Sequence, residues 1–340
     1  MKNAARHAAC GTLLTLAALP ALAAGHPWMS DAALVAAAQK EGSVTFYSST
    51  NEDEQLPELK LFEEATGIKA DYIRGGDSQL MARIQVESRA GKELWDAINI
   101  PEVESMPKSA ILAFHPAEAD KLVPQARDPE NRWFGIYTIF HAPAYNTTRI
   151  KPVDLPARYE DFLKHPEWAG HVAIESTDRD WLAGVVGDYG MARGTKLIQD
   201  IVAALKPTIH RGHLAMARAL GSGEYWVTLN NFVNLTLNAK MAGDPVEYWI
   251  TEPVVVTYGE IGANAKAPHP NAAKLLVNFI LSQEAQTLRT KWGRIPTRAD
   301  VETNPPGILE RFKAKHVVRA ALSAEEDAQW QKRCDEWFEQ

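Results

Sequence analysis

Three hydroxyl side chains, Ser48, Ser49 and Thr50, follow directly after an apolar run at residues 44–47. The β-branched and aromatic residues of this run predict a buried strand. Hydroxyl groups at the carboxyl end of a strand in an open α/β sheet lie where such sheets bind ligands. The same residues can instead cap the helix predicted to follow them. The choice between a ligand site and a helix cap depends on the surrounding elements.

Strands and helices are predicted to alternate on both sides of these hydroxyls. The predicted strands are residues 44–50, 68–73 and 95–100. The predicted helices are residues 31–40, capped by Ser30, residues 54–65, and one that is capped by Asp77 or Ser78. The order strand, helix, strand, helix, strand predicts a parallel sheet connected by right-handed crossovers.

A second α/β series is predicted after an extended segment at residues 134–145. It contains strands at 171–175 and 225–229, helices at 195–205 and 213–220, and an extended segment at 246–258 that could return the chain to the first series. A strongly apolar helix is then predicted at 272–281. Ser323 and Glu326 form a capping box that predicts the start of a last helix.

Length and charge limit the class of protein. A chain of 340 residues is longer than one hydrophobic core usually serves, which favours two domains of roughly 100 to 200 residues each. The net charge of −7 argues against nucleic-acid binding, because that function requires a basic surface.

Residues 1–24 are typical of a secretory signal peptide. Lys2 and Arg6 form a basic start, and the apolar stretch at 11–22 is too short to be a convincing membrane span. Cleavage would remove Cys10 and leave Cys334 unable to form an internal disulfide. Cys334 shares a predicted helix face with two tryptophans, so we expect it to be a packing residue. We expect a soluble protein exported to the periplasm.

Several segments, in a fixed order, carry a resemblance to a known family. They are residues 41–49, 62–68, 144–147, 269–275 (His-Pro-Asn-Ala-Ala-Lys-Leu), 279–286 and 293–296 (Gly-Arg-Ile-Pro). Together they resemble periplasmic solute-binding proteins of the ferric-iron-binding type, over nearly all of the chain that follows the signal peptide.

The resemblance implies a class II periplasmic-binding-protein fold, in which two doubly wound α/β sheets are joined by two crossing strands. Lobe one would contain residues 26–138 and 256–340, and lobe two residues 139–255. A ligand would be held in the cleft between the lobes and delivered to an ABC-type permease of the inner membrane. We expect a monomer without a cofactor.

Ligand-binding residues are expected at the strand-to-helix turns, because backbone N–H groups converge there. Each such residue also has an ordinary role, since glycine permits tight turns and serine or aspartate caps helices. As a set they favour a binding cleft, with Trp181 as a wall. The candidates are Ser48, Ser49, Thr50, Gly76, Asp77, Ser78 and Glu102 in lobe one, and Ser176, Thr177, Arg179, Trp181, Asn230 and Asn231 in lobe two.

The resemblance also allows a test for iron. Iron binders of this family hold the metal with two adjacent tyrosines, a histidine and a carboxylate, and the tyrosine positions correspond to Phe232 and Val233 here. The histidine position falls on or near Asn51, and the carboxylate corresponds to Glu102. Ferric iron prefers anionic oxygen ligands, so we expect no tyrosine-type iron site. Metal binding through a non-tyrosine or anion-assisted site stays an alternative.

The predicted ligand is a small polar solute, either an organic anion or an oxyanion. Glycine-rich turns at helix starts suit a carboxylate, phosphate or phosphonate, and Arg179 could add a charge-assisted contact. Glu52, Asp53 and Glu54 lie next to the hydroxyls, where they would attract an amine or merely offset a helix macrodipole. A zwitterion such as an amino acid or aminophosphonate would satisfy both sets of groups.

A secreted hydrolase is the alternative from another class. The sequence contains no Gly-x-Ser-x-Gly elbow, no His-Glu-x-x-His zinc motif and no Gly-Lys-Ser/Thr phosphate loop. We therefore expect a carrier that binds its ligand stoichiometrically without turnover.

Overall fold

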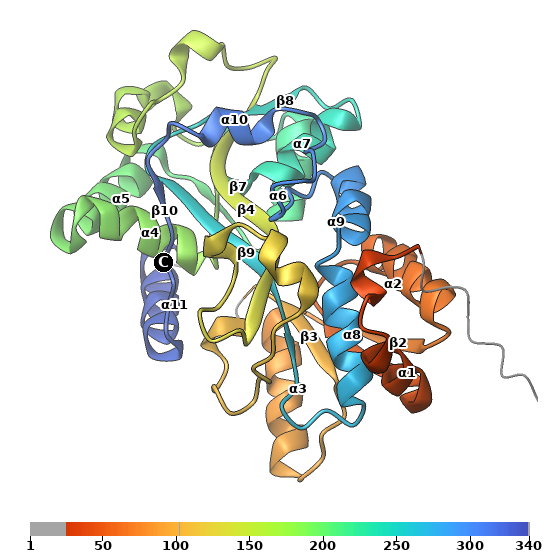
Figure 1. Ribbon diagram of the computed structural model, residues 1–340. Coiled ribbons are helices and arrows are strands. Elements are labelled where there is room, and N and C mark those ends of the chain that lie inside the picture. Colours follow the sequence, from red (N-terminus) through yellow and green to blue (C-terminus); the bar gives the residue numbers. More distant parts are fainter. Residues whose placement is uncertain (1–24, 102, 339–340) are drawn as a thin grey trace, which may run out of the picture.

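The computed structural model describes residues 25–101 and 103–338, in two α/β lobes (Figure 1). The α/β class agrees with the sequence-based prediction. The predicted signal peptide and the candidate ligand residue Glu102 lie outside the described residues.

Most predicted segments correspond to one observed element with ends that differ by a few residues, but the extended segment predicted at 246–258 is two separate strands, β8 and the first half of β9. The strands are β1 (Ser43–Ser48), β2 (Lys69–Arg74), β3 (Ala97–Ile100), β4 (Trp133–Asn146), β5 (Val172–Glu175), β6 (Thr208–His210), β7 (Val227–Phe232), β8 (Val246–Tyr248), β9 (Val254–Ala263) and β10 (Val317–Val318). The α-helices are α1 (Ala32–Glu41), α2 (Glu52–Thr66), α3 (Asp77–Arg89), α4 (Arg179–Tyr189), α5 (Met191–Leu205), α6 (His213–Ser222), α7 (Val233–Met241), α8 (Pro270–Ile280), α9 (Gln283–Arg289), α10 (Ile308–Phe312) and α11 (Ala324–Phe338).

The main strands pair in the order β2-β1-β3-β9-β4-β7-β5-β6. β1 is parallel to β2 and β3 in the first lobe, and β5 is parallel to β6 and β7 in the second. β4 and β9 are antiparallel to each other and run between the lobes (Figure 1). They are the two predicted crossing strands. Because they pair with each other, the strands of the two lobes form one continuous sheet.

Both crossing strands are buried along their whole length, which explains their almost unbroken apolar sequence. Gly259 in β9 is required by close packing, because a Cβ atom there would lie 2.2 Å from Cζ of Tyr137 in β4. A register shift between Gly135 and Tyr137 bulges the ladder at the same place. The junction between the lobes is therefore a tightly packed pair of strands.

Each lobe has its own aromatic core. In the first lobe, the ring of Phe279 in α8 lies 4.9 Å from Trp28 and 5.6 Å from Phe62, centroid to centroid. In the second lobe, Tyr159 contacts Trp181 at 5.9 Å between centroids. These separations fall in the range of favourable aromatic pairs, so separate cores support the two lobes.

The end of the chain packs on the second lobe. Phe312 of α10 stacks on Phe140 of β4 with 3.9 Å between ring centroids, and α11 buries Cys334 and Phe338 in the core that contains α4. This packing differs from the predicted assignment of residues 256–340 to lobe one. The apolar face of α11 was recognised in the sequence, but the sequence did not indicate which lobe it covers. The remaining predicted lobe boundaries stay predictions.

Helix starts agree with the sequence in one case and differ in two. Ser323 and Glu326 form the predicted capping box, with Glu326 N donating to Ser323 Oγ at 3.3 Å. Asp31, and not Ser30, caps α1 by accepting hydrogen bonds from two first-turn amides at 3.0 Å. Gly76 takes the cap position of α3, so neither Asp77 nor Ser78 is its cap.

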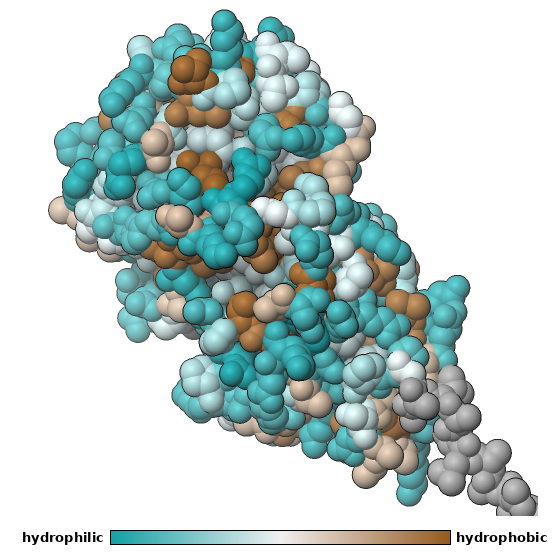
Figure 2. All heavy atoms as spheres, turned by 45° about the horizontal axis from the view of Figure 1, so that its top comes forward, coloured by the Kyte–Doolittle hydropathy of each residue, from teal (hydrophilic) through white to brown (hydrophobic). Residues whose placement is uncertain are grey.

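The surface in Figure 2 is mostly hydrophilic, with apolar side chains in small separate groups. Among the described residues, every helix is too short or too polar to cross a membrane.

Candidate functional site

A pocket of about 720 Å³ lies where the two lobes meet the crossing strands. Its size is in the range of small-molecule sites. The first lobe contributes the start of α3 and Pro101, the crossing strands contribute three side chains, and the second lobe contributes the turn after β5, the start of α6 and part of α11. The lining residues are Gly76, Asp77, Ser78, Gln79, Pro101, Ile139, His141, Glu175, Thr177, Asp178, Arg179, Asp180, Arg211, His213, Phe232, Thr257, Gln331 and Asp335.

Five of the candidate ligand residues line this pocket. They are Gly76, Asp77 and Ser78 from the first lobe and Thr177 and Arg179 from the second. The structure thus brings together two turns that are about 100 residues apart in the chain. Their role as ligand residues stays a prediction that the pocket's location supports.

The opening hydroxyls Ser48 and Thr50 do not line the pocket, because both are buried and hydrogen bonded within the first lobe. Ser48 Oγ and Thr50 Oγ1 donate to Asn99 Oδ1 at 3.0 and 2.8 Å, and Thr50 N donates to Ser48 Oγ at 3.1 Å. These hydrogen bonds hold the turn that follows β1 against strand β3. Ser49 does not line the pocket either. Burial raises the pKa of Asp77, and nearby Ser49 opposes this increase.

Four candidates from the second lobe lie behind the pocket wall. Trp181 is 1% exposed and donates its Nε1–H to Tyr159 Oη at 2.7 Å, so it packs in the core instead of forming a wall of the cleft. Asn230 holds the turn after β5, accepting from Glu175 N and donating to Glu175 O, both at 2.9 Å. Asn231 accepts from Phe232 N at the start of α7. Ser176, which follows Glu175 in the chain, is buried and does not line the pocket.

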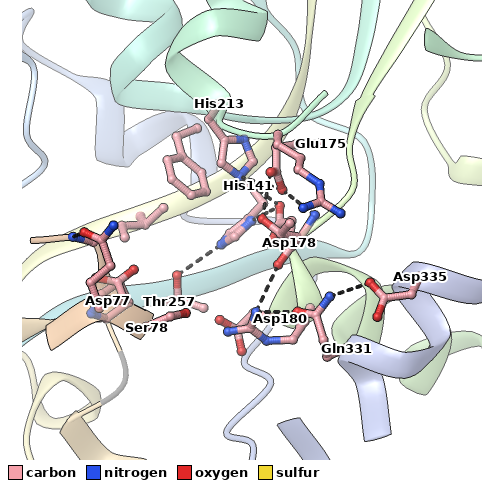
Figure 3. Close-up of a pocket in the computed structure, with 18 residues that line it drawn as sticks. Asp77, Ser78, His141, Glu175, Asp178, Asp180, His213, Thr257, Gln331 and Asp335 are labelled. Atoms are coloured by element: carbon pink, nitrogen blue, oxygen red, sulfur yellow. Dashed lines mark hydrogen bonds and ion pairs between the residues drawn. The ribbon is translucent and has the colours of Figure 1, made fainter. Parts of the chain in front are cut away.

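A buried carboxylate with two histidines forms the floor of the pocket (Figure 3). Asp178 Oδ2 lies 2.9 Å from His141 Nδ1 in β4 and 3.5 Å from His213 Nε2 in α6. The other nitrogen of His141 lies 3.0 Å from Thr257 Oγ1 in β9. The network thus connects both crossing strands to two helix starts of the second lobe.

The charges of this network depend on one another. Burial disfavours the protonated form of His141, but the attraction of Asp178 is stronger and raises its pKa. Burial would also raise the pKa of Asp178, and the two histidines together lower it. Burial lowers the pKa of His213, against the attraction of Asp178 and Glu175. The arrangement thus favours the charged forms of His141 and Asp178 and the neutral form of His213.

Arg179 is held in place by α11. Its guanidinium forms an ion pair with Asp327 and donates from Nη1 to Gln331 Oε1 at 2.9 Å. Gln331 in turn donates to Asp335 Oδ1 at 2.8 Å, and both of these α11 residues line the pocket (Figure 3). The last helix therefore contributes directly to the pocket wall.

Two helix N-termini face the pocket, one from each lobe, and the cap position of each is a glycine. The first turn of α3 lines the pocket at Asp77, Ser78 and Gln79, and Gly76 provides no side-chain hydrogen bond to that turn. α6 begins at His213, also on the pocket, after Gly212, which likewise provides no cap. Gly76 N already donates to Gln79 Oε1 at 3.1 Å, and Gly212 N already donates to Glu175 Oε1 at 2.9 Å. The amides that follow these two glycines are the N–H donors that the helix starts offer to an anion, together with a partial positive charge.

The pocket does not match a tyrosine-type iron site. No tyrosine is present among the residues that line it. Phe232, at one expected tyrosine position, stacks on His213 with 3.7 Å between ring centroids, and Val233 is buried. Within residues 25–101 and 103–338, no group of three or more histidine, cysteine or carboxylate side chains is arranged to hold a metal ion.

The sequence did not single out several pocket residues. His141, Arg211 and His213 are not among the candidates predicted from the sequence. The pairing of His141 with Asp178 spans 37 residues and joins two lobe elements, so local spacing carries no signal for it. The contribution of α11 depends on long-range packing and is equally invisible to a motif search.

The sequence profile of a family described as bacterial extracellular solute-binding protein matches residues 103–317. This match covers more than half of the 340 residues. The chain therefore belongs to the family of bacterial extracellular solute-binding proteins, and the resemblance inferred from the sequence motifs is confirmed.

Two relatives have names that refer to iron. "Iron uptake protein A1" of Synechocystis sp. is 25% identical over 281 residues, which are 75% of this chain and 76% of that protein. The "Fe(3+)-binding periplasmic protein" of Serratia marcescens is 26% identical over 194 residues, 55% of this chain and 56% of that protein.

A solved structure of the periplasmic binding protein AfuA from Actinobacillus pleuropneumoniae, with exogenous fructose-6-phosphate bound, has the same fold. It superposes with a TM-score of 0.74 at 19% identity, over 88% of this chain and 99% of that chain. The likeness confirms the two-lobed periplasmic-binding-protein fold, and at this identity it shows the fold alone.

Proposed function

We propose that this protein is the solute-binding component of an ABC transporter and captures a small polar organic solute that carries an anionic group. The solute would bind in the interlobe pocket and be delivered to an inner-membrane permease. The observation that carries this proposal is the pair of helix N-termini, from α3 and α6, that have glycine at the cap position and face one pocket from opposite lobes. The protein would act in the periplasm as a monomer.

The anion would contact the first-turn amides of α3 and the start of α6. The guanidinium groups of Arg179 and Arg211 also line the pocket and would add charge-assisted contacts. Two of the pocket carboxylates are already satisfied within the protein, since Glu175 accepts from Thr177 N and Gly212 N and Asp178 pairs with His141. They therefore oppose an anion less than their formal charges imply.

The other pocket carboxylates suit donor groups on the same solute. Asp77, Asp180 and Asp335 line the pocket and can accept hydrogen bonds from hydroxyl or ammonium groups. A sugar phosphate, an aminophosphonate or an amino acid carries both an anion and such donors. The fructose-6-phosphate in the AfuA structure supports the first of these classes.

Binding would close the cleft. A solute that contacts α3 in the first lobe and α6 in the second binds the closed form more tightly than the open form, and so shifts the population toward closure. The crossing strands β4 and β9 would absorb the movement.

A thermal-shift screen of the mature protein would identify the solute. The panel should contain carboxylates, phosphonates, sugar phosphates and amino acids. A solute at 100 times its dissociation constant stabilises the folded state by about 2.7 kcal/mol, which raises the melting temperature by several degrees. Depletion of the solute during incubation would instead support an enzyme, and no shift with any compound would count against the proposal.

A pair of variants at Gly76 tests the anion contact. A Cβ atom at Gly76 would lie 3.7 Å from the nearest side-chain atom, so a side chain fits there. Asn and Asp cap helices about equally well, but only Asp places a negative charge at the pocket. A like charge at about 4 Å costs about 1–4 kcal/mol. Gly76→Asp should therefore weaken binding of the identified anion at least fivefold more than Gly76→Asn. Equal affinities would overturn the anion assignment.

Ferric iron is the second candidate, because two named relatives at 25–26% identity are iron proteins. The absence of tyrosine from the pocket lining argues that iron alone lacks suitable ligands here. Titration with Fe³⁺, with and without citrate, separates the cases. Tight binding of iron without added anion would favour this candidate over an organic solute.

A further inference from the structure

A second opening, of about 580 Å³, lies between the lobes and shares no lining residue with the ligand pocket. The first lobe lines it with Asn51, Glu52, Asp53 and Arg74, and the second lobe lines it with Leu214 and Arg218 of α6. It forms a mouth of the cleft, where opposing lobe surfaces would approach each other on closure.

The two sides of this mouth carry opposite charge. Glu52 and Asp53 are exposed in the first turn of α2, and with Arg74 they leave the first-lobe side one unit negative. Arg218 is exposed on the other side, four residues after Leu214 and therefore on the same helix face. Among the residues that the structure describes, Glu52, Asp53 and Arg218 form no salt bridge.

The third residue of the acidic run already has a partner. Glu54 receives hydrogen bonds from Arg294 at 2.8 and 3.2 Å within the first lobe. Offsetting the macrodipole of α2 accounts for acidic residues in its first turn, but it does not account for a cation placed opposite them on the other lobe.

We propose that Arg218 pairs with Glu52 and Asp53 when the cleft closes, and that this pairing helps to set the ligand affinity from outside the ligand pocket. The inference rests on the proposed function, because it assumes that the lobes close on a solute. The acidic run therefore does not recognise an amine of the ligand. It belongs to a contact between lobes that forms only in the closed state.

The expected effect is modest and depends on salt. Exposed ion pairs are weakened by solvent and by side-chain entropy, and screening extends over about 8 Å at physiological ionic strength. A contact made only in the closed form raises the closed population, so its loss weakens ligand binding. We expect a change of about two- to fivefold, which becomes smaller as salt is added.

Cross-linking between the lobes tests the proposal without any ligand. Asn51→Cys and Leu214→Cys place thiols on opposite sides of the mouth and leave all three charges unchanged. A short bis-maleimide should join these thiols faster than it joins the control pair Glu64→Cys and Leu214→Cys. Glu64 lies 13 residues after Asn51, which is about 20 Å further along α2. Cys334 is buried and should not compete.

The decisive comparison is the rate of cross-linking when charges are reversed in the protein that carries Asn51→Cys and Leu214→Cys, which we call the reporter protein. Arg218→Glu should slow cross-linking about threefold, and adding Glu52→Lys and Asp53→Lys should restore the original rate to within twofold. Arg193→Glu reverses a charge on α5, outside the mouth, and should leave the rate unchanged. Equal melting temperatures would show that each variant is folded.

Two results would overturn the proposal. One is an Arg218→Glu rate equal to that of the reporter protein, and the other is a combined reversal that fails to restore the rate. Because the assay contains no ligand, its failure is distinct from a failure of the solute screen. A positive screen with an unaffected cross-linking rate would retain the carrier function and reject this contact.

Discussion

Replacing Asp178 by Asn should destabilise the second lobe most strongly at acidic pH. Asp178 joins β4 to the start of α4, because its Oδ2 pairs with His141 and its Oδ1 accepts from Trp181 N at 3.2 Å. Both side chains of the pair are at most 3% exposed. The amide keeps the size of the side chain and an oxygen for the helix cap, but it removes the buried negative charge.

The expected cost follows from the burial of the pair. Removing one partner of a buried ion pair costs about 3–5 kcal/mol when the other charge stays uncompensated. His141 can reduce this cost by losing its proton, so we expect about 2–4 kcal/mol at pH 5.5. As the pH rises through the raised pKa of His141, this histidine loses its charge in the native protein too, and the loss approaches the difference between hydrogen bonds to a charged and to a neutral acceptor, about 1–2 kcal/mol.

The sign of the pH dependence follows from the two pKa shifts. The pKa of His141 is raised in the folded protein, so its contribution is complete below the unfolded value and is lost as pH rises through the folded value. The pKa of Asp178 is lowered, so its contribution is lost only in strong acid. The ion pair therefore stabilises the fold at pH values between the lowered pKa of Asp178 and the raised pKa of His141. His213 would also lose the attraction of Asp178, which increases the same dependence.

Thermal unfolding of the mature protein at pH 5.5 and pH 9 measures the difference. At about 2 °C per kcal/mol for a chain of this size, Asp178→Asn should lower the melting temperature by about 4–8 °C at pH 5.5 and about half as much at pH 9. Asp120→Asn is the matched control, because Asp120 pairs with His115 at 3.2 Å on the exposed surface and should produce no resolved shift. A larger effect at pH 9 than at pH 5.5 would refute the reasoning.

Three further predictions separate core residues from pocket residues. Trp181→Phe removes the hydrogen bond to Tyr159 and should cost about 1–3 kcal/mol of stability, with solute affinity unchanged in calorimetry; a selective loss of affinity would instead place Trp181 at the ligand. Ser48→Ala leaves Thr50 N without its acceptor and should cost about 1–2 kcal/mol in urea unfolding, whereas Ser78→Ala, on the pocket, should weaken binding without lowering the melting temperature. Burial raises the pKa of Cys334 to about 12, so a thiol reagent at pH 8 should react only after unfolding; fast reaction of the native protein would contradict this placement.

Sequence periodicity was sufficient to predict most of the fold. The alternation of apolar residues around β1, and the glycines that end α1 and α2, are local signals that tertiary packing did not override. The resemblance to a family then supplied the order of the lobes. Local signals were weaker at helix starts, where Ser30 and Asp31 both suit a cap and only the backbone geometry selects Asp31.

The candidate site was only partly predictable, for physical reasons. Turns at strand ends can be recognised from residue type, which is why Gly76 and Thr177 were among the candidates that line the pocket. Residue type does not show whether a hydroxyl points to a cleft or to a neighbouring strand, and Ser48 bonds to Asn99 in β3. His141 could not be predicted as a pocket residue for a related reason. A histidine within an apolar strand resembles a core residue until its partner Asp178 is known.

The crossing strands have the ligand pocket on one face and a mostly apolar cavity on the other. Ile139, His141 and Thr257 face the ligand pocket, while Phe140 and Val256 face a mostly apolar cavity behind it that Phe312 of α10 also lines. The chain passes behind the strands in α10 and returns to the pocket in α11, which packs on α4. On closure, α11 should therefore move with α4 and carry the Arg179 side chain as one rigid unit toward the start of α3. A solute that contacts both Arg179 and the α3 amides would then make all of its contacts only in the closed form. Binding would therefore stabilise the closed form, as a carrier that closes on its solute requires.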